Sequence, residues 1–280
     1  MSNLKALAYE LRERTMDIIM SGKAGHIGGD MSVMEILTEL YFDQMNISPE
    51  NMEDPDRDKF VMSKGHSVEA YYAVLARKGF FSQEEVVSQF SQFGSQYIGH
   101  PNNKLPGIEM NSGSLGHGRP VCVGMALAAK MNGQKCRVYT VMGDGELAEG
   151  SVWEGTMAAS HYKLDNLCAV VDRNRLQLDD FTENMMSMEP YADKWKAFGW
   201  NVVEVDGHDM GALVDAIDNL PPVSSDVPTV MIGNTVKGKG VSFMENNPDW
   251  HAGSVSPEDM KKAIDEIEEE YTKRREGEWA

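Results

Sequence analysis

Residues 137–176 read RVYTVMGDGELAEGSVWEGTMAASHYKLDNLCAVVDRNRL, and this stretch decides the fold of the 280-residue chain. Residues 137–142 and 167–172 are short, largely apolar runs that are typical of buried strands, and residues 149–161 between them have a helical pattern. A strand–helix–strand unit of this kind predicts two parallel strands joined by a helical crossover.

The same alternation continues along the chain. Further strands are expected at 59–62, 202–205 and 229–232, and further helices at 4–20, 31–42, 67–78, 190–198, 209–219 and 257–275. The Gly-rich segment 22–30 and the long segment 91–117 are expected to be irregular. We therefore expect one α/β domain over residues 1–280, in which a parallel β-sheet is covered by helices on both faces.

Composition excludes several classes of function. The 44 acidic and 26 basic residues give a net charge of −18, which argues against a nucleic-acid or anionic membrane partner. No apolar run approaches the ~20 residues of a membrane span, and the charged N-terminal helix does not read as a signal peptide. Cys122, Cys136 and Cys168 lie in apolar stretches and form no CxxC pair, so they predict buried thiols. We expect a cytoplasmic protein.

Polar side chains follow two strands of the expected sheet. Asp144, between Gly143 and Gly145, follows the first strand, and Asn174 follows the second. If the two strands are neighbours, both side chains face the crevice where open α/β sheets bind ligands. Carboxylate and carboxamide oxygens suit a hard cation such as Mg²⁺, and the glycines let the backbone approach a diphosphate closely. The isolated GDG is most simply a turn, so it is the strand–helix–strand context that favours a metal site.

This segment resembles the thiamine diphosphate motif, in which GDG is followed about thirty residues later by Asn. The resemblance extends over most of the chain and indicates the transketolase family. Three Gly-rich histidine loops are similar to those of the family: Lys23–His26 with Ser32 and Glu35, Ser63–His66, and Gly99–Pro101 with Leu105–Glu109 and Gly113–Gly116.

The resemblance implies a role for each matching residue. Asp144, Asn174 and the backbone carbonyl of Leu176 would hold Mg²⁺ (or Ca²⁺ or Mn²⁺) on the diphosphate of thiamine diphosphate. Other cofactor contacts would come from His66, Gly113, Leu115, Gly143, Gly145, Glu149 and His251. Glu149 and Glu154 also match acidic positions near the family's subunit interface.

The catalytic set implied by the resemblance is His26, His100 and His251. His26 and His100 would contact the hydroxyl and carbonyl oxygens of a ketose donor. His251 is the loosest match, because the spacing around it departs from the family pattern. A single histidine after glycine is most simply a turn residue, and only the three matching loops together favour a site. We interpret His161 and His208 as structural and assign no role to His117.

One part of the family's machinery is missing from these 280 residues. In transketolases a Glu on a second, pyrimidine-binding domain activates the cofactor, and full-length relatives are more than twice as long. The resemblance therefore implies the N-terminal subunit of a split transketolase, which transfers a two-carbon ketol unit between sugars or sugar phosphates. Its partner would be a C-terminal subunit carrying the pyrimidine-binding domain, in an α₂β₂ heterotetramer.

Two alternatives remain open. The α subunit of a 2-oxoacid dehydrogenase carries the same GDG and Asn motif, but a decarboxylating site does not need the sugar contacts that His26, His66 and His100 would supply. The other alternative is a non-catalytic cofactor-binding module. An activity like that of deoxyxylulose phosphate synthase is a variant of the transketolase hypothesis.

Overall fold

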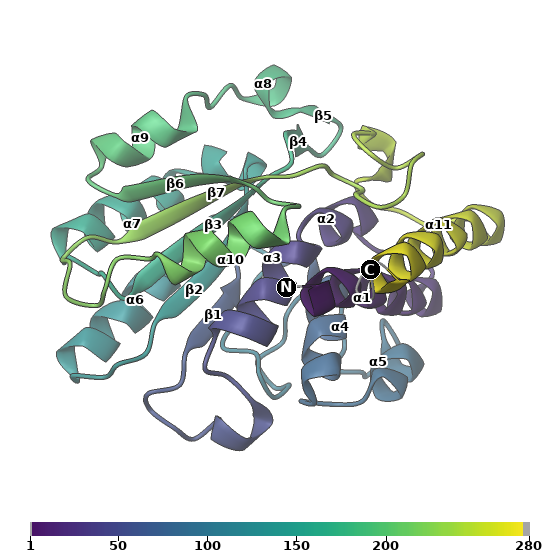
Figure 1. Ribbon diagram of the computed structural model, residues 1–280, viewed down its shortest axis with the longest axis horizontal. Helices are drawn as coiled ribbons and strands as arrows, with labels where there is room; N and C mark the ends of the chain where they lie inside the picture. The colour runs from purple at the N-terminus through teal and green to yellow at the C-terminus, as the bar shows by residue number, and fades with distance from the viewer. Residues whose placement is uncertain (1, 277–280) are drawn as a thin grey trace.

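Five parallel strands form the central sheet of the computed structural model, which describes residues 2–276 (Figure 1). The strands are β1 (Lys59–Met62), β2 (Val138–Gly143), β3 (Leu167–Arg173), β6 (Asn201–Asp206) and β7 (Thr229–Asn234). Their order in the sheet is β1-β2-β3-β7-β6, and every neighbouring pair is parallel. β2 and β3 are neighbours, with Gly143 opposite Asp172, so the two strand ends meet at one edge.

Helices cover both faces of the sheet, as the sequence predicts. One face carries α1 (Ser2–Gly22), α3 (Met34–Glu39), α4 (Val68–Lys78) and α10 (Met210–Asp218). The other carries α6 (Gly118–Met131), α7 (Gly150–His161) and α9 (Tyr191–Ala197). The remaining short elements are α2 (Ile27–Ser32), η1 (Leu40–Gln44), η2 (Pro49–Asn51), α5 (Gln83–Gln89), η3 (Gly145–Ala148), β4 (Leu176–Gln177), β5 (Asp180–Phe181), α8 (Thr182–Met185) and η4 (Pro248–Trp250).

The alternation of side chains along each strand explains the two-sided core. Tyr139 and Val141 of β2 pack into the cluster under α1, α3, α4 and α10, whereas Val138 and Met142 pack under α6, α7 and α9. Successive side chains of a strand point to opposite faces, so a strand that is apolar throughout must be covered twice. The apolar runs in the sequence therefore become buried central strands.

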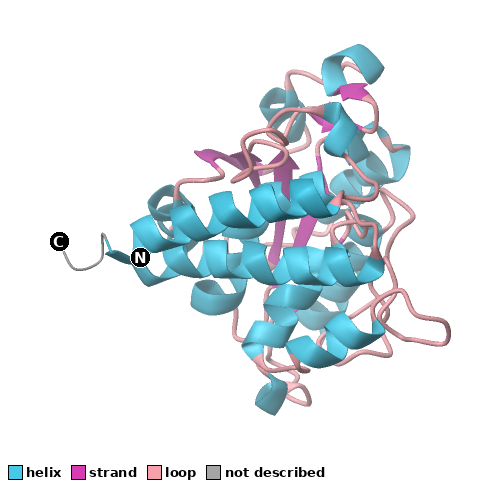
Figure 2. Cartoon of the chain, turned by 90° about the vertical axis from the view of Figure 1, so that its right-hand side faces the viewer, coloured by secondary structure: helices cyan, strands magenta, loops and turns pink. Residues whose placement is uncertain are grey.

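A third apolar cluster joins the two ends of the described chain. α11 (Pro257–Glu276) packs along α1, and Figure 2 shows these long helices side by side. Arg274 near the end of α11 lies 4.1 Å above the ring of Tyr9 near the start of α1, so the helices run antiparallel. This packing places the C-terminal part of the chain beside the N-terminal helices, where Gly25 and Gly253 form an isolated antiparallel β-bridge.

The expectation of a loop over the whole of residues 22–30 was wrong. Helix α2 begins at Ile27 and includes Gly28 and Gly29. A Cβ at Gly28 would lie 2.6 Å from the carbonyl oxygen of Trp250, and one at Gly29 would lie 2.8 Å from Ser67 Oγ. These glycines therefore permit close packing of a helix rather than an irregular turn.

Several other local features differ from the sequence predictions. The helix expected at 31–42 is divided into the end of α2, α3 and the π-helical turn η1. Helices α5 and α6 were not predicted, while the segment 91–117 is irregular as expected. Cys122, Cys136 and Cys168 are buried free thiols, which confirms their interpretation. Within residues 2–276, the helices are all too short or too polar to cross a membrane.

Candidate active site

A cavity of about 200 Å³ opens at the carboxyl ends of β2 and β3, between loops from six parts of the chain. It brings together eleven of the predicted site residues: His26, His66, His100, Gly113, Leu115, Gly143, Asp144, Gly145, Asn174, Leu176 and His251. It is also lined by six residues that were not predicted as site residues: Gly29, Lys64, Glu146, Gln177, Leu178 and Lys237.

Asp144 and Asn174 occupy corresponding positions after adjacent strands. The Asp144 carboxylate accepts hydrogen bonds from the backbone N–H of Gly145 (3.0 Å) and of Arg175 (2.6 Å). Asn174 Oδ1 accepts a bond from the N–H of Leu176 (3.1 Å). Burial, and then the nearby charge of Asp172, raise the pKa of Asp144 to about 7. The site therefore concentrates negative charge and oxygen ligands at one point.

Asp172, at the end of β3, is fully buried beside this pair and collects several donors. Lys64 Nζ lies 2.5 Å and Ser32 Oγ 2.6 Å from Asp172 Oδ2, and Thr235 donates to the other oxygen. Asn174 Nδ2 also donates to Oδ2, at 3.2 Å. Burial alone would raise the pKa of Asp172, but Lys64 and these hydrogen bonds lower it below its ordinary value. Asp172 is thus a stable buried anion that links four segments.

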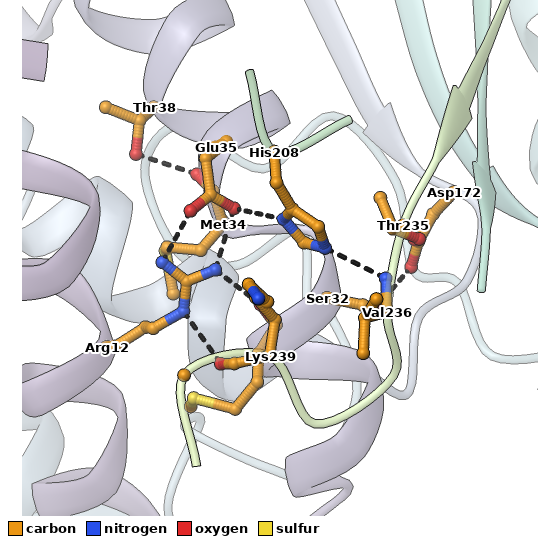
Figure 3. A network of polar contacts seen from close by, with 12 residues as sticks. Arg12, Ser32, Met34, Glu35, Thr38, Asp172, His208, Thr235, Val236 and Lys239 are labelled. Carbon is orange, nitrogen blue, oxygen red and sulfur yellow. Dashed lines mark hydrogen bonds and ion pairs between the residues drawn. The ribbon is translucent and has the colours of Figure 1, made fainter. Parts of the chain in front are cut away.

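A second polar network holds the segment that follows β7 (Figure 3). Arg12 forms two 2.7 Å hydrogen bonds to Glu35, whose carboxylate also lies 2.9 Å from His208 Nδ1. The N–H of Val236 donates to His208 Nε2 at 2.8 Å. Because Nε2 accepts this bond, Nδ1 is the nitrogen that donates to Glu35, and His208 fixes the chain one residue before Lys237. Its structural interpretation agrees with these contacts.

The four cavity histidines form a cluster around His26. Its ring centroid lies 5.3 Å from that of His66, 5.7 Å from that of His251 and 6.2 Å from that of His100. Burial, followed by neighbouring positive groups, lowers the pKa of His26 to about 4 and that of His251 to about 3. These imidazoles are neutral at pH 7, so each can donate one hydrogen bond and accept another.

Lys237 is the buried cation that sequence reasoning missed. Its side chain is 2% exposed, and its Nζ lies 2.5 Å from His251 Nδ1. Burial and the charge of Lys64 lower the pKa of Lys237 to about 8. Because its partner is a neutral imidazole, Lys237 still offers its charge to an anionic ligand in the cavity. The sequence TVKGKG gives no signal of this role, which depends on the packing of the loop against α2.

Glu146, on the turn η3, was also missed. One of its oxygens accepts bonds from the Ser63 hydroxyl and from the N–H of Gly116 (2.8 Å), and the other from the N–H of Gly143 (3.2 Å). Burial raises its pKa above the ordinary value. The Glu146 carboxylate thus holds together the three cavity loops that carry His66, Leu115 and Asp144.

Three other residues lie outside the cavity lining. Glu149 is exposed and packs against Gly116, where an added Cβ would lie 2.6 Å from Glu149 Cβ. His117 is exposed, and its Nδ1 contacts Ser114 Oγ and the carbonyl of Leu115. His161 lies on the exposed end of α7 against Tyr162.

No group of three or more His, Cys, Asp or Glu side chains is placed to hold a metal in residues 2–276. The expected ligand set differs from such a group, because it combines one carboxylate with a carboxamide and a backbone carbonyl. Those three residues, Asp144, Asn174 and Leu176, line the same cavity. An oxygen set of this kind suits a hard cation that keeps water and phosphate ligands.

Comparison with known proteins identifies relatives over nearly the whole chain. A family model described as "Transketolase, thiamine diphosphate binding domain" matches residues 4–271. The chain is 47% identical over 262 residues to a protein of Phocaeicola vulgatus that is named as one subunit of an apulose-4-phosphate transketolase, covering 94% of this chain and 92% of that protein. It is 39% identical over 269 residues to a 6-deoxy-6-sulfo-D-fructose transketolase subunit from a Clostridium species, covering 96% of this chain and 97% of that one.

The solved transketolase structures that match are longer than this chain. Transketolase of Campylobacter jejuni superposes with a TM-score of 0.89 at 26% identity, covering 98% of this chain and 46% of that one. Human transketolase, which is 37% identical over 270 residues, is likewise covered over 42% of its length. The chain therefore spans less than half of these transketolases, but nearly the whole of the two relatives whose names call them subunits.

We expect Glu146→Ala to destabilise the chain, because it leaves the N–H groups of Gly116 and Gly143 and the Ser63 hydroxyl without their buried acceptor. The expected loss in the free energy of unfolding is about 2–4 kcal/mol. Chemical denaturation at pH 7 measures it, with Glu154→Ala on the exposed face of α7 as the matched control. Equal stability of the two variants would contradict the role of Glu146.

Proposed function

Because this chain belongs to the transketolase family through its thiamine diphosphate-binding domain, we propose that it is the N-terminal subunit of a two-chain transketolase. Such an enzyme transfers a two-carbon ketol unit from a ketose to an aldose. The main support is the convergence of eleven predicted site residues on one cavity, together with near full-length similarity to proteins named as transketolase subunits. When bound, thiamine diphosphate supplies the nucleophilic thiazolium carbon that carries the two-carbon unit.

The diphosphate end of the cofactor fits the polar wall of the cavity. Asp144, Asn174 and the carbonyl of Leu176 would hold Mg²⁺, or Ca²⁺ or Mn²⁺, and this cation would balance the charge of the diphosphate. Lys237 supplies a buried positive charge on the same cavity. The metal and Lys237 together would offset the negative charge of the diphosphate.

The other wall suits the rings of the cofactor and a sugar. Leu115 and Leu178 offer apolar contacts, and Gly113, with φ of +140°, lets the backbone come within reach of a ring. A Cβ at Gly113 would also lie 2.6 Å from the His100 ring, so glycine is required there for His100 to face the cavity. We propose that His26 and His100, both neutral, hydrogen-bond the hydroxyl and carbonyl oxygens of the ketose donor, with His251 beside them.

Exposed apolar side chains at the rim of the cavity favour contact with a second subunit. Leu178, Phe181, Met185 and Met186 of the β4–β5–α8 segment are 44–56% exposed and continue from the cavity wall. Exposed apolar side chains gathered beside a site are typical of an interface. We propose that residues 1–280 form a single diphosphate-binding domain and that a partner chain brings the pyrimidine-binding domain and its activating Glu.

We further propose an α₂β₂ arrangement, since a two-fold dimer of such pairs would close each cavity. The buried free thiols of Cys122, Cys136 and Cys168 support a reducing compartment, so we place the protein in the cytoplasm.

We expect Asp144→Ala to abolish metal-dependent binding of thiamine diphosphate, because one of three oxygen ligands is lost and the diphosphate charge is no longer balanced. The apparent affinity should fall by about 100-fold or more. Calorimetric titration of the partner complex with cofactor and Mg²⁺ measures this. Asp193→Ala, which removes an exposed carboxylate on α9 outside the cavity lining, is the control. Unchanged affinity in Asp144→Ala would remove the metal assignment.

The decisive experiment for the function is reconstitution. The purified chain should show no ketol transfer with thiamine diphosphate, Mg²⁺, a ketose donor and an aldose acceptor, because the proposal assigns the pyrimidine-binding domain to its partner. Addition of a second chain that carries that domain should restore turnover, and the reconstituted mixture should elute as a hetero-oligomer. Strong activity of the chain by itself would refute the two-chain proposal.

A further inference from the structure

Two buried carboxyl groups lie beneath the loop that carries His26. Asp30 on α2 is fully buried, and Glu69 near the start of α4 is 1% exposed. Ala70, the residue after Glu69, donates its N–H to Asp30, which places the two carboxyl groups side by side, and each shifts the pKa of the other. Lys64, which acts on Asp30 electrostatically, is itself paired with Asp172 and donates to the carbonyl of Gly29. Within residues 2–276, the pair therefore has no cation of its own.

The hydrogen bonds of this pair are incomplete unless it holds a proton. Asp30 Oδ1 accepts a bond from the N–H of Ala70 at 3.1 Å. Asp30 Oδ2 and Glu69 Oε2 are both buried, and neither has a donor in the described part of the chain. Two ionised carboxylates in contact would repel each other at a cost that burial increases. One proton placed between them satisfies both oxygens.

Glu69 also supports the backbone segments that carry His26 and His251. A Cβ at Gly25 would lie 2.7 Å from Glu69 Oε1, so the loop rests directly on this carboxyl group. Gly25 exchanges two backbone hydrogen bonds with Gly253, at 3.1 and 3.0 Å. His26 follows Gly25, and His251 comes two residues before Gly253. A change in the charge or position of Glu69 would therefore shift both histidines.

We propose that Asp30 and Glu69 share one proton and that this acid pair positions His26 for the donor substrate. Asp30 donates through Oδ2 to Glu69, while its Oδ1 accepts from Ala70. Neither carboxyl group lines the cavity, so both act through the His26 loop as positioning residues. The part of the inference that concerns the donor rests on the function proposed above, whereas the shared proton is a property of this chain alone.

The titration of the pair is set by its surroundings. Burial, and then the charge of Glu69, raise the pKa of Asp30 well above its ordinary value, and burial raises the pKa of Glu69 to about 7. The ionisable groups that face the pair are Lys64 and the Tyr72 hydroxyl, and the backbone N–H of His26 lies against Glu69. Because both pKa values are raised in the folded chain, the protonated pair stabilises the fold most at low pH. This stabilisation falls as the pH rises through about 7 for Glu69 and through the raised pKa of Asp30.

Two substitutions at Asp30 distinguish the effect of the shared proton from the effect of side-chain packing. In Asp30→Asn the amide keeps an oxygen for Ala70 and donates an N–H to Glu69, so it copies the protonated acid without titrating. In Asp30→Ala that donor is lost, and the charge of Glu69 is left buried without a partner. The matched control is Glu39→Gln. Glu39 is 1% exposed, burial raises its pKa to about 9, and it does not line the cavity.

The first measurement is the melting temperature of the purified chain between pH 6 and 8.5, which needs neither partner nor cofactor. The Tm of Asp30→Asn should fall less steeply with pH than that of the wild type. The second is steady-state kinetics of the reconstituted enzyme. Asp30→Ala should raise the KM for the ketose donor about tenfold and change cofactor affinity less than threefold. Asp30→Asn and Glu39→Gln should keep the donor KM of the wild type.

Each outcome bears on one claim. If the Tm of Asp30→Asn depends on pH as steeply as that of the wild type, the shared proton is refuted. If the two Asp30 variants have the same donor KM in an active enzyme, positioning through the proton is refuted. If the wild-type mixture shows no ketol transfer, the proposed function fails, while the melting curves still decide whether the pair holds a proton.

Discussion

A buried carboxylate at the end of the central strand is the constraint on which the site depends. Asp172 is the penultimate residue of β3, the middle strand of the sheet, and accepts hydrogen bonds from Ser32, Lys64, Asn174 and Thr235. An unpaired anion at that depth would be very unfavourable, so the segments that bring these donors must lie in place when the chain folds. Two of these donors, Lys64 and Asn174, line the cavity themselves. Ser32 lies on the same helix as Gly29, and Thr235 lies two residues before Lys237, and both Gly29 and Lys237 line the cavity.

The cavity combines this fixed charge with groups that are held neutral. Burial and neighbouring cations lower the pKa values of His26, His66 and His251, so the imidazoles act as hydrogen-bonding groups and not as charges. Lys237 keeps a positive charge on the wall that also carries Asp144. In the proposed enzyme, a diphosphate with a divalent cation and a neutral, hydroxyl-rich sugar would face these two walls. The exposed apolar rim at Leu178 and Phe181 would face the proposed partner chain.

The sequence predicted the architecture because apolar strands and helical crossovers are local signals. The ends of adjacent parallel strands meet by topology, and this is why Asp144 and Asn174 could be paired from their spacing. Lys237 and Glu146 could not be found in the same way, since a lysine or glutamate in a turn is usually exposed. Their burial depends on contacts between segments that are distant in sequence. The helical state of Gly28 and Gly29 was missed for the same reason, because only packing against Trp250 and Ser67 explains it.

The most direct test of the central claim is hydrogen exchange in the double variant Asp172→Asn/Lys64→Met, which removes the buried anion and its ammonium partner together and so leaves no uncompensated charge. If Asp172 organises the site, amides of β2 and β3 should keep their protection, while those of Thr235, Val236 and Gly238 should exchange at least about tenfold faster than in the wild type. Wild-type protection of those three amides would contradict the account.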